Sequence, residues 1–422
     1  MSSQNSLNPF DKSKDRTGSF EFSLKPSGLD WLGDIPAHWT IERAKNVFSV
    51  RDERSERGDE ELLSVSHITG VTSRADKEVY MFKADDMTGY KRCYPNDLVI
   101  NTLWAWMGAM GVSPLEGIVS PDYHVYKSKG LLLPEFIELL CRSKPFIAEV
   151  NRWSKGVWSS RLRLYPENFF EIRLPIPPKG EQQDIIEYID RETAHIDALI
   201  AEKKHMLELL VEKRLSLVHD IISHADTKMT RIRHCAERVF RPIERLEDET
   251  YIPVGLYNRG RGVFHKDTTL GRNLGDSEFF YIREGDLILS GQFAWEGSVA
   301  MASQAEEGCV VSHRYHVFRG REGKLDTTYF WAYLTTKIGD FVLQDHSRGS
   351  AGRNRPLNPN TLEKEKIPLP PIDLQLKVAN LVRYEQRLKL VIAESEALLN
   401  ERRQNLITAA VAGQIDSKEM IV

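Results

Sequence analysis

The sequence predicts an α+β protein in which two strand-rich globular domains are separated by two long antiparallel coiled-coil helices, with an internal pseudo-twofold repeat. The first observation is a proline-rich segment that occurs twice, at residues 174–183 and 367–375. Each copy leads into roughly 40 residues with the apolar period of a helix and no internal proline or glycine. The second observation is a set of short motifs that recur in the same order in both halves of the chain.

A narrow apolar stripe runs along each predicted helix. In the first helix it consists of Ile185, Ile189, Ile196, Leu199, Met206, Leu210 and Leu217. In the second it consists of Val378, Val382, Ile392, Leu399 and Leu406. Long helices of this kind usually bury the stripe against a similar helix, so we expect the two copies to pair. The proline-rich segments align at an offset of 193 residues and the helix ends at 189, so the first helix should be about four residues longer.

Length and composition indicate a multidomain protein. The 422 residues suggest two or three domains. The chain has no run of about 18 apolar residues and no signal-peptide pattern at its polar N-terminus, so we expect a cytoplasmic protein. Four widely spaced cysteines (Cys93, Cys141, Cys235 and Cys309) are expected to be buried thiols. The net charge of −4 argues only mildly against nucleic acid, because a local basic patch can coexist with acidic helices.

The repeated motifs define the expected boundaries. Residues 95–100 match 284–289 and residues 105–108 match 294–297, both at an offset of 189, which drifts to 193 further along the chain. We therefore expect a polar tail (1–27), a first globular domain (28–178), a first long helix (179–225), a second globular domain (226–371), a second long helix (372–414) and a C-terminal tail (415–422). Antiparallel helices would place the domains at opposite ends of a rod, which suits duplex DNA as a partner.

The most basic stretches occupy equivalent places in the repeat. Residues 151–164 contain Arg152, Lys155, Arg161 and Arg163 and no acid. Residues 346–362 contain Arg348, Arg353 and Arg355, again with no acid. Arginine is the preferred donor to phosphate and guanine, so we favour DNA contact over two solvated loops.

Other candidates have competing structural interpretations. Residues 257–262, with Arg259 and Arg261, form either a contact loop or a glycine-rich hairpin, with nothing to separate the two. Trp106 and Trp295 can stack on bases, but a tryptophan present in both Ala-Trp-x-Gly turns favours a core position. Tyr123-His124 and Tyr315-His316 are interpreted as strand residues.

Enzyme signatures are missing from the sequence. It contains no Walker A motif and no GxGxxG. Residues 322–324 have the ExK form of a nuclease without the aspartate that such sites place shortly before it, and residues 8–10 only approach an amino-methyltransferase signature. We therefore predict no catalytic residue and no metal site.

Three motifs resemble the specificity subunits of Type I restriction–modification systems. They are the opening at residues 31–39 (Trp31-Leu32-Gly33-Asp34-Ile35-Pro36-x-x-Trp39), the segment at 174–182 (Leu174-Pro175-x-Pro177-Pro178-x-x-Glu181-Gln182) and the ending at 401–413 (Glu401-Arg402-Arg403 through Gly413). The resemblance covers the chain from about Gly28 to Asp416. Two features depart from the pattern: Leu374 stands where the first copy has Glu181, and the helices are unequal.

The resemblance implies two target-recognition domains that each read one half of a bipartite, asymmetric sequence in double-stranded DNA, with helices that set the gap. It implies a subunit without catalytic activity or a cofactor of its own. Its partners would be two methylation subunits that use S-adenosylmethionine and restriction subunits that use ATP. The competing interpretations are an enzyme with its own methyltransferase or nuclease activity, and a coiled-coil scaffold without a nucleic-acid role.

Overall fold

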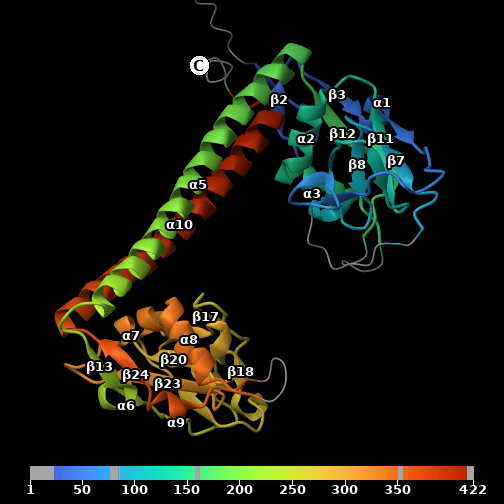
Figure 1. Ribbon diagram of the computed structural model, residues 1–422. Coiled ribbons are helices and arrows are strands. Elements are labelled where there is room, and N and C mark those ends of the chain that lie inside the picture. The colour runs from blue at the N-terminus through green and yellow to red at the C-terminus, as the bar shows by residue number, and fades with distance from the viewer. Residues whose placement is uncertain (1–22, 77–83, 85, 157–161, 350–354, 416–422) are drawn as a thin grey trace, which may run out of the picture. The chain divides into compact units, whose positions relative to one another are not determined.

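The computed structural model describes residues 23–76, 84, 86–156, 162–349 and 355–415, which form two compact units. The first unit combines Met1–Ile200 with Glu396–Val422, and the second is Ala201–Ser395. Each unit contains one globular domain together with one end of each long helix (Figure 1). None of the described helices is both long and apolar enough to cross a membrane.

The first globular domain is built on a four-stranded antiparallel sheet with the order β4-β11-β8-β9. These strands are Phe48–Arg51, Tyr123–Ser128, Leu98–Asn101 and Met110–Val112. Successive side chains of a strand point to opposite faces, and β8 is buried on both. Leu98 and Ile100 join the core formed with the helices, whereas Val99 joins a second core formed with smaller strand pairs.

The smaller elements of this domain surround the sheet. The strand pairs are β5 (Leu63–Ser66) with β6 (Gly70–Ser73), β7 (Lys91–Cys93) with β10 (Gly117–Val119), β3 (Thr40–Arg43) with β12 (Arg173–Ile176) and β1 (Leu24–Pro26) with β2 (Asp34–Pro36). The helices are α1 (Ala44–Val47), α2 (Pro134–Arg142), α3 (Lys144–Trp153) and α4 (Pro166–Glu171). Strand β1 falls inside the stretch expected to be a tail.

Residues 134–153 form two helices, α2 and α3, rather than one continuous helix. The chain is extended at Ser143, between α2 and α3. Pro145 follows at the start of α3, where its missing N–H is harmless, whereas the same residue inside a continuous helix would remove a hydrogen bond and clash with the preceding turn. The proline therefore explains the break.

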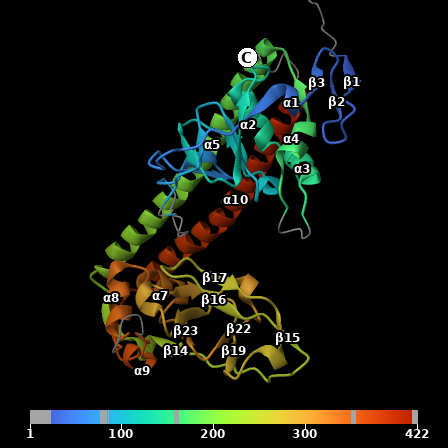
Figure 2. The same ribbon diagram turned by 90° about the vertical axis from the view of Figure 1, so that its right-hand side faces the viewer.

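The second globular domain repeats this architecture, with a four-stranded antiparallel sheet of order β14-β23-β20-β21. Strands β14 and β23 of this sheet are labelled in Figure 2. These strands are Ala236–Arg238, Tyr315–Gly320, Leu287–Ser290 and Val299–Met301. The strand pairs are β16 (Val254–Leu256) with β17 (Val263–His265), β19 (Phe279–Tyr281) with β22 (Val310–Ser312), β13 (Lys228–Arg231) with β24 (Lys366–Leu369) and β15 (Thr250–Tyr251) with β18 (Thr269–Leu270). The helices are α6 (Ile232–Cys235), α7 (Thr327–Leu334), α8 (Lys337–Asp345) and α9 (Pro359–Leu362).

The duplication that the sequence predicts is confirmed in the elements themselves. Strand β8 corresponds to β20 at an offset of 189, and β11 corresponds to β23 at 192. The 3-10 turns η1 (Ala105–Met107) and η4 (Ala294–Glu296) also correspond, and each is closed by a glycine in the left-handed region. Tyr123-His124 and Tyr315-His316 begin β11 and β23, which confirms their strand assignment.

The two long helices are α5 (Lys179–Ile222, 44 residues) and α10 (Ile372–Val411, 40 residues), which confirms the expected difference of four. In the first unit the start of α5 shares a core with the end of α10, through Ile185, Ile189, Ile407 and Val411. In the second unit the end of α5 shares a core with the start of α10, through Val218, Ile221, Val378 and Val382. The helices are therefore antiparallel, as predicted.

A buried glutamine attaches each long helix to its own globular domain. The Gln182 side chain donates to the carbonyls of Pro177 (2.8 Å) and Leu131 (3.0 Å) and accepts from the Leu133 amide (2.7 Å). Gln375, at an offset of 193, makes the same three bonds, to Pro370 O (2.8 Å), Lys324 O (3.0 Å) and from the Asp326 amide (2.8 Å). Both side chains are fully buried.

The three motifs of the resemblance meet in the first unit. The Trp39 indole donates to the Glu181 carboxylate (2.7 Å), which joins the opening motif to the first turn of α5. Gly413, just past the end of α10, has a left-handed φ of +65°, and a Cβ there would lie 2.4 Å from Pro36 and 2.8 Å from Trp39. The ending motif thus needs a glycine because the opening motif packs directly on its backbone.

Candidate nucleic-acid interface

An isolated β-bridge lies within each of the two predicted basic stretches. The backbones of Lys155 and Arg163 exchange two hydrogen bonds of 2.9 Å, and Ser347 pairs with Leu357 in the second unit. Each loop is then joined to the strand end beside it. The Leu164 amide donates to Thr102 O (3.4 Å), and the Leu357 amide donates to Gly291 O (2.8 Å). The loops therefore leave the two domains from equivalent places.

Seven of the nine predicted contact residues lie in the described part of the chain, because Arg161 and Arg353 fall outside it. Arg152 is already paired: its guanidinium bonds both oxygens of Glu149 (2.7 and 2.6 Å) and lies 5.2 Å from the Trp153 ring. Glu149 precedes the acid-free stretch by two residues, and α3 brings it one turn below Arg152. Because Glu149 lies one helical turn before Arg152, the lack of acids within residues 151–164 does not leave Arg152 unpaired.

The other described candidates are exposed cations without an acidic partner. Within the described residues, no carboxylate lies within ion-pair distance of Lys155, Arg163, Arg259, Arg261, Arg348 or Arg355. Arg355 instead lies 5.1 Å from the ring of Trp295, and the Arg348 Nε donates to Asp345 O (3.0 Å). Unpaired surface arginines keep their donors available for phosphate or base edges.

The loop at residues 257–262 is a hairpin loop, between β16 and β17, so that interpretation is confirmed for its backbone. Arg259, Gly260 and Gly262 all have positive φ. The loop is held against turn η4, because the Arg259 amide donates to Glu296 O (3.0 Å) and the Gly260 amide donates to Gly297 O (2.7 Å). Arg259 and Arg261 are exposed on this anchored hairpin, and their contact with DNA stays a prediction.

A cavity of about 880 Å³ lies beside this hairpin. It is lined by the hairpin itself, by turn η4 with Trp295, and by the start of α8 with Lys337. Its lining contains three cations, Arg259, Arg261 and Lys337, and two acids, Glu296 and Asp340. This mixture of donors, acceptors and a flat ring matches what base edges and phosphates require of a protein surface.

The prediction that Trp106 and Trp295 are core residues is wrong. Both are only partly buried, and their indole N–H groups donate to Leu103 O (3.0 Å) and Gln292 O (3.1 Å) in their own turns. The buried residue of each turn is the alanine before the tryptophan, Ala105 or Ala294. In a 3-10 turn of three residues only one side chain faces the sheet, and the small one occupies that place.

Sequence reasoning also missed two exposed rings beside these turns. Trp104 is 50% exposed and Phe293 is 40% exposed, and both precede the Ala-Trp-x-Gly turn. Trp104 stacks on Trp106 with a centroid distance of 6.1 Å. The signal that could have found them is the offset of 189, at which both halves have an aromatic residue.

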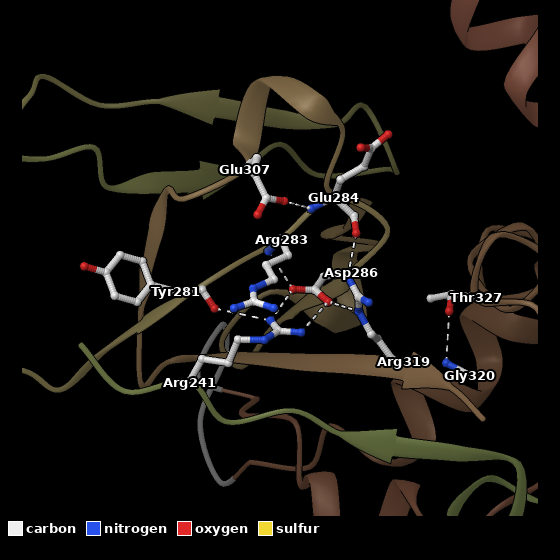
Figure 3. A network of polar contacts seen from close by, with 9 residues as sticks. All are labelled: Arg241, Tyr281, Arg283, Glu284, Asp286, Glu307, Arg319, Gly320 and Thr327. Atoms are coloured by element: carbon white, nitrogen blue, oxygen red, sulfur yellow. Dashed lines mark hydrogen bonds and ion pairs between the residues drawn. The ribbon is translucent and has the colours of Figure 1, made fainter. Parts of the chain in front are cut away.

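Asp286 is a fully buried carboxylate at the centre of a network of ion pairs (Figure 3). Asp286 is fully buried and accepts from Arg241 (2.7 and 3.2 Å), from Arg319 and from the Arg283 amide (2.8 Å). Its counterpart at an offset of 189, Asp97, is held by Arg51 in the first unit. Asp286 is therefore paired with two guanidinium groups and Asp97 with one, while burial raises the pKa of Asp97.

Burial shifts the pKa values of two histidines and of the cysteines in the direction that favours their neutral forms. Burial lowers the pKa of His124 and of His316 to about 4, which keeps both rings neutral at physiological pH. All four cysteines are buried and free, as predicted, and burial raises the pKa of Cys93 to about 12 and that of Cys235 to about 11. Among the described residues, no cluster of three or more His, Cys, Asp or Glu side chains can hold a metal ion.

Comparisons with known proteins agree with this geometry. Residues 244–388 match the family described as the Type I restriction modification DNA specificity domain. A structure described as the basis of complex assembly and conformational transition of the type I R-M system is 18% identical, covers 90% of this chain and 99% of its own, and has a TM-score of 0.61. The HsdS subunit from Thermoanaerobacter tengcongensis is 15% identical, with 90% and 98% covered and a TM-score of 0.50.

No curated protein sequence gives a significant match to this one. The structural likenesses, both well under 25% identity, establish the shared fold, and the family match covers part of the second globular domain and the start of α10. Residues 244–388 therefore match a Type I restriction modification DNA specificity domain, within a fold that the chain shares with HsdS over nine-tenths of its length.

Proposed function

We propose that the chain is the non-catalytic DNA-specificity subunit of a Type I restriction–modification complex. The observation that carries the proposal is the duplication: a specificity domain at residues 244–388 has a structural counterpart in the first half, with a basic loop anchored at the same place. Each domain reads one half of a bipartite, asymmetric sequence in double-stranded DNA.

The differences between the halves support separate half-sites. The hairpin loop in the second unit contains Arg259 and Arg261, whereas the corresponding hairpin in the first unit, between β5 and β6, contains His67 and Thr69. Base edges are read by hydrogen bonds from side chains such as these, so different loops on one scaffold imply different bases. The central sheets and the glutamine attachments stay the same because they hold the loops in place.

The partners follow from the same proposal. Two methylation subunits, which use S-adenosylmethionine, modify an adenine in each half-site, and restriction subunits use ATP. The long helices α5 and α10 set the gap between the half-sites. Support for the chain's non-catalytic role comes from its buried ionisable groups, because Asp286 and Asp97 are occupied by arginines and the thiols are protonated.

One experiment separates this proposal from an enzyme with its own activity. Purified chain is incubated with S-adenosylmethionine or Mg²⁺ and DNA, alone and with a methylation subunit from the same system. The proposal expects sequence-specific adenine methylation only when the methylation subunit is present. Methylation or cleavage by the chain alone would favour the enzyme alternative.

A further inference from the structure

One aromatic ring stands exposed at the same place in both units. Trp104 and Phe293 lie three residues after the inner strands β8 and β20 and immediately precede turns η1 and η4. Their backbones are fixed: the Trp104 amide donates to Asn101 O (3.0 Å), and the Phe293 amide donates to Ser290 Oγ (3.2 Å). Because the following alanine is buried, the ring itself is left outside the core. An exposed aromatic on a rigid turn loses little conformational entropy when it binds.

Each ring lies beside a basic loop. The strand end that carries the ring also accepts the hydrogen bond from the loop, at Thr102 O in the first unit and Gly291 O in the second. In the second unit the loop cation Arg355 lies over Trp295, two residues from Phe293. In the second unit an aromatic ring and a cation are therefore side by side, and in the first unit Arg163 directly precedes the residue whose amide reaches Thr102.

The kind of contact can be inferred from what the halves share. Groups that read base edges should differ between domains that read different bases, and the hairpin loops do differ. The exposed ring is present in both halves, as Trp in one and Phe in the other. A ring of either kind offers only a face and an edge, which suits stacking, a contact that forms with any of the four bases.

We propose that Trp104 and Phe293 are wedges that insert at an opened base step, one in each half-site, while the neighbouring arginines hold the phosphates. The inference rests on the proposed function, because it requires each domain to bind DNA. The faces of the bases are covered by stacking in an intact duplex, so a ring can stack on them only where a step is opened. Insertion would kink the duplex and bring more of the backbone to the basic loops.

The test uses the assembled complex with the methylation subunit and duplexes in which 2-aminopurine replaces one base at a time, away from the methylated adenine. The fluorescence of 2-aminopurine rises when a neighbouring base no longer stacks on it, and an inserted ring separates the two bases of one step. We expect a several-fold rise at one step in each half-site. Trp104→Ala should abolish the rise in one half-site only, and Phe293→Ala in the other only, so each half serves as the control for the other.

Two further variants separate the ring from its surroundings. Trp104→Phe should keep the fluorescence rise, because a flat ring remains. Val50→Ala, at an exposed apolar position on β4, the opposite edge of the same sheet, should leave it unchanged.

Specific binding without any fluorescence rise in the unchanged complex would overturn the wedge and leave DNA reading intact. A rise that persists in Trp104→Ala and Phe293→Ala would also overturn it. If Trp104→Ala or Phe293→Ala prevents assembly with the methylation subunit, the ring makes a protein contact and the wedge is overturned. Failure of the unchanged complex to bind DNA would contradict the proposed function itself.

Discussion

The attachment of each long helix to its globular domain predicts how a single buried side chain controls the gap between half-sites. Replacing Gln182 with Met keeps an unbranched side chain of similar length in the first turn of α5 and leaves little room for water. It removes three hydrogen bonds, to Pro177 O, Leu131 O and from the Leu133 amide. At about 1 kcal/mol for each lost bond, the junction should open about 3 kcal/mol more easily.

Hydrogen exchange measures that opening directly. A change of 1.4 kcal/mol is a factor of ten, so the Leu133 amide should exchange about 100-fold faster in the Gln182→Met variant. Gln375→Met should do the same at the Asp326 amide. The matched control is Gln183→Met, because Gln183 is an exposed neighbour whose side chain bonds only Glu187 among the described residues.

The functional readout is the spacing of methylated adenines. A looser junction should yield methylation at sites whose gap differs by a base pair from the usual one, with both half-sites kept. An unchanged exchange rate at Leu133 would refute the energetic reasoning. Faster exchange with a single, unchanged gap would show that the glutamines stabilise the domains without fixing the spacing.

Three further predictions address the loops, the domains and the helices. Arg163→Ala or Arg355→Ala should weaken DNA binding and flatten its salt dependence by about one unit of slope for each lost phosphate contact. Arg152→Ala should have a smaller effect, because Arg152 is already paired with Glu149. Unchanged slopes would mean that these arginines only face solvent. Exchanging residues 230–365 for the same domain of a relative should change one half of the methylated sequence, and a change in both halves or in neither would contradict modular reading. Inserting four residues near Ala201, with a matching insertion in α10, adds about 6 Å to the helices and should lengthen the gap by one or two base pairs, whereas the original gap at full activity would rule out a ruler.

Much of the fold could be predicted from the sequence, because the patterns that specify it extend over many residues. The apolar stripes of α5 and α10 extend over many turns, so local exceptions such as the exposed Met206 did not hide them. The repeat was visible because motifs at tight turns constrain several residues at once. The helix ends were less well predicted: the expected boundaries at 225 and 414 lie three residues beyond Ile222 and Val411, since helix ends depend on local packing and capping.

The candidate site was harder to predict because it depends on which side of a short turn a ring occupies. Trp106 and Trp295 were assigned to the core on residue type, but Ala105 and Ala294 take that position. Arg152 lies in the acid-free stretch 151–164, but α3 places Glu149 one turn before it and the two side chains pair. Neither outcome can be obtained from composition, since each is decided by the geometry of one turn.

A methylation map tests the central claim most directly. The chain is expressed with a methylation subunit in cells that lack other adenine methylation, and every methylated adenine in the DNA is located. The account predicts one bipartite, asymmetric sequence with a fixed gap, and complete loss of methylation when the chain is omitted. Methylation that is unspecific, that follows a continuous sequence without a gap, or that persists without the chain would contradict it.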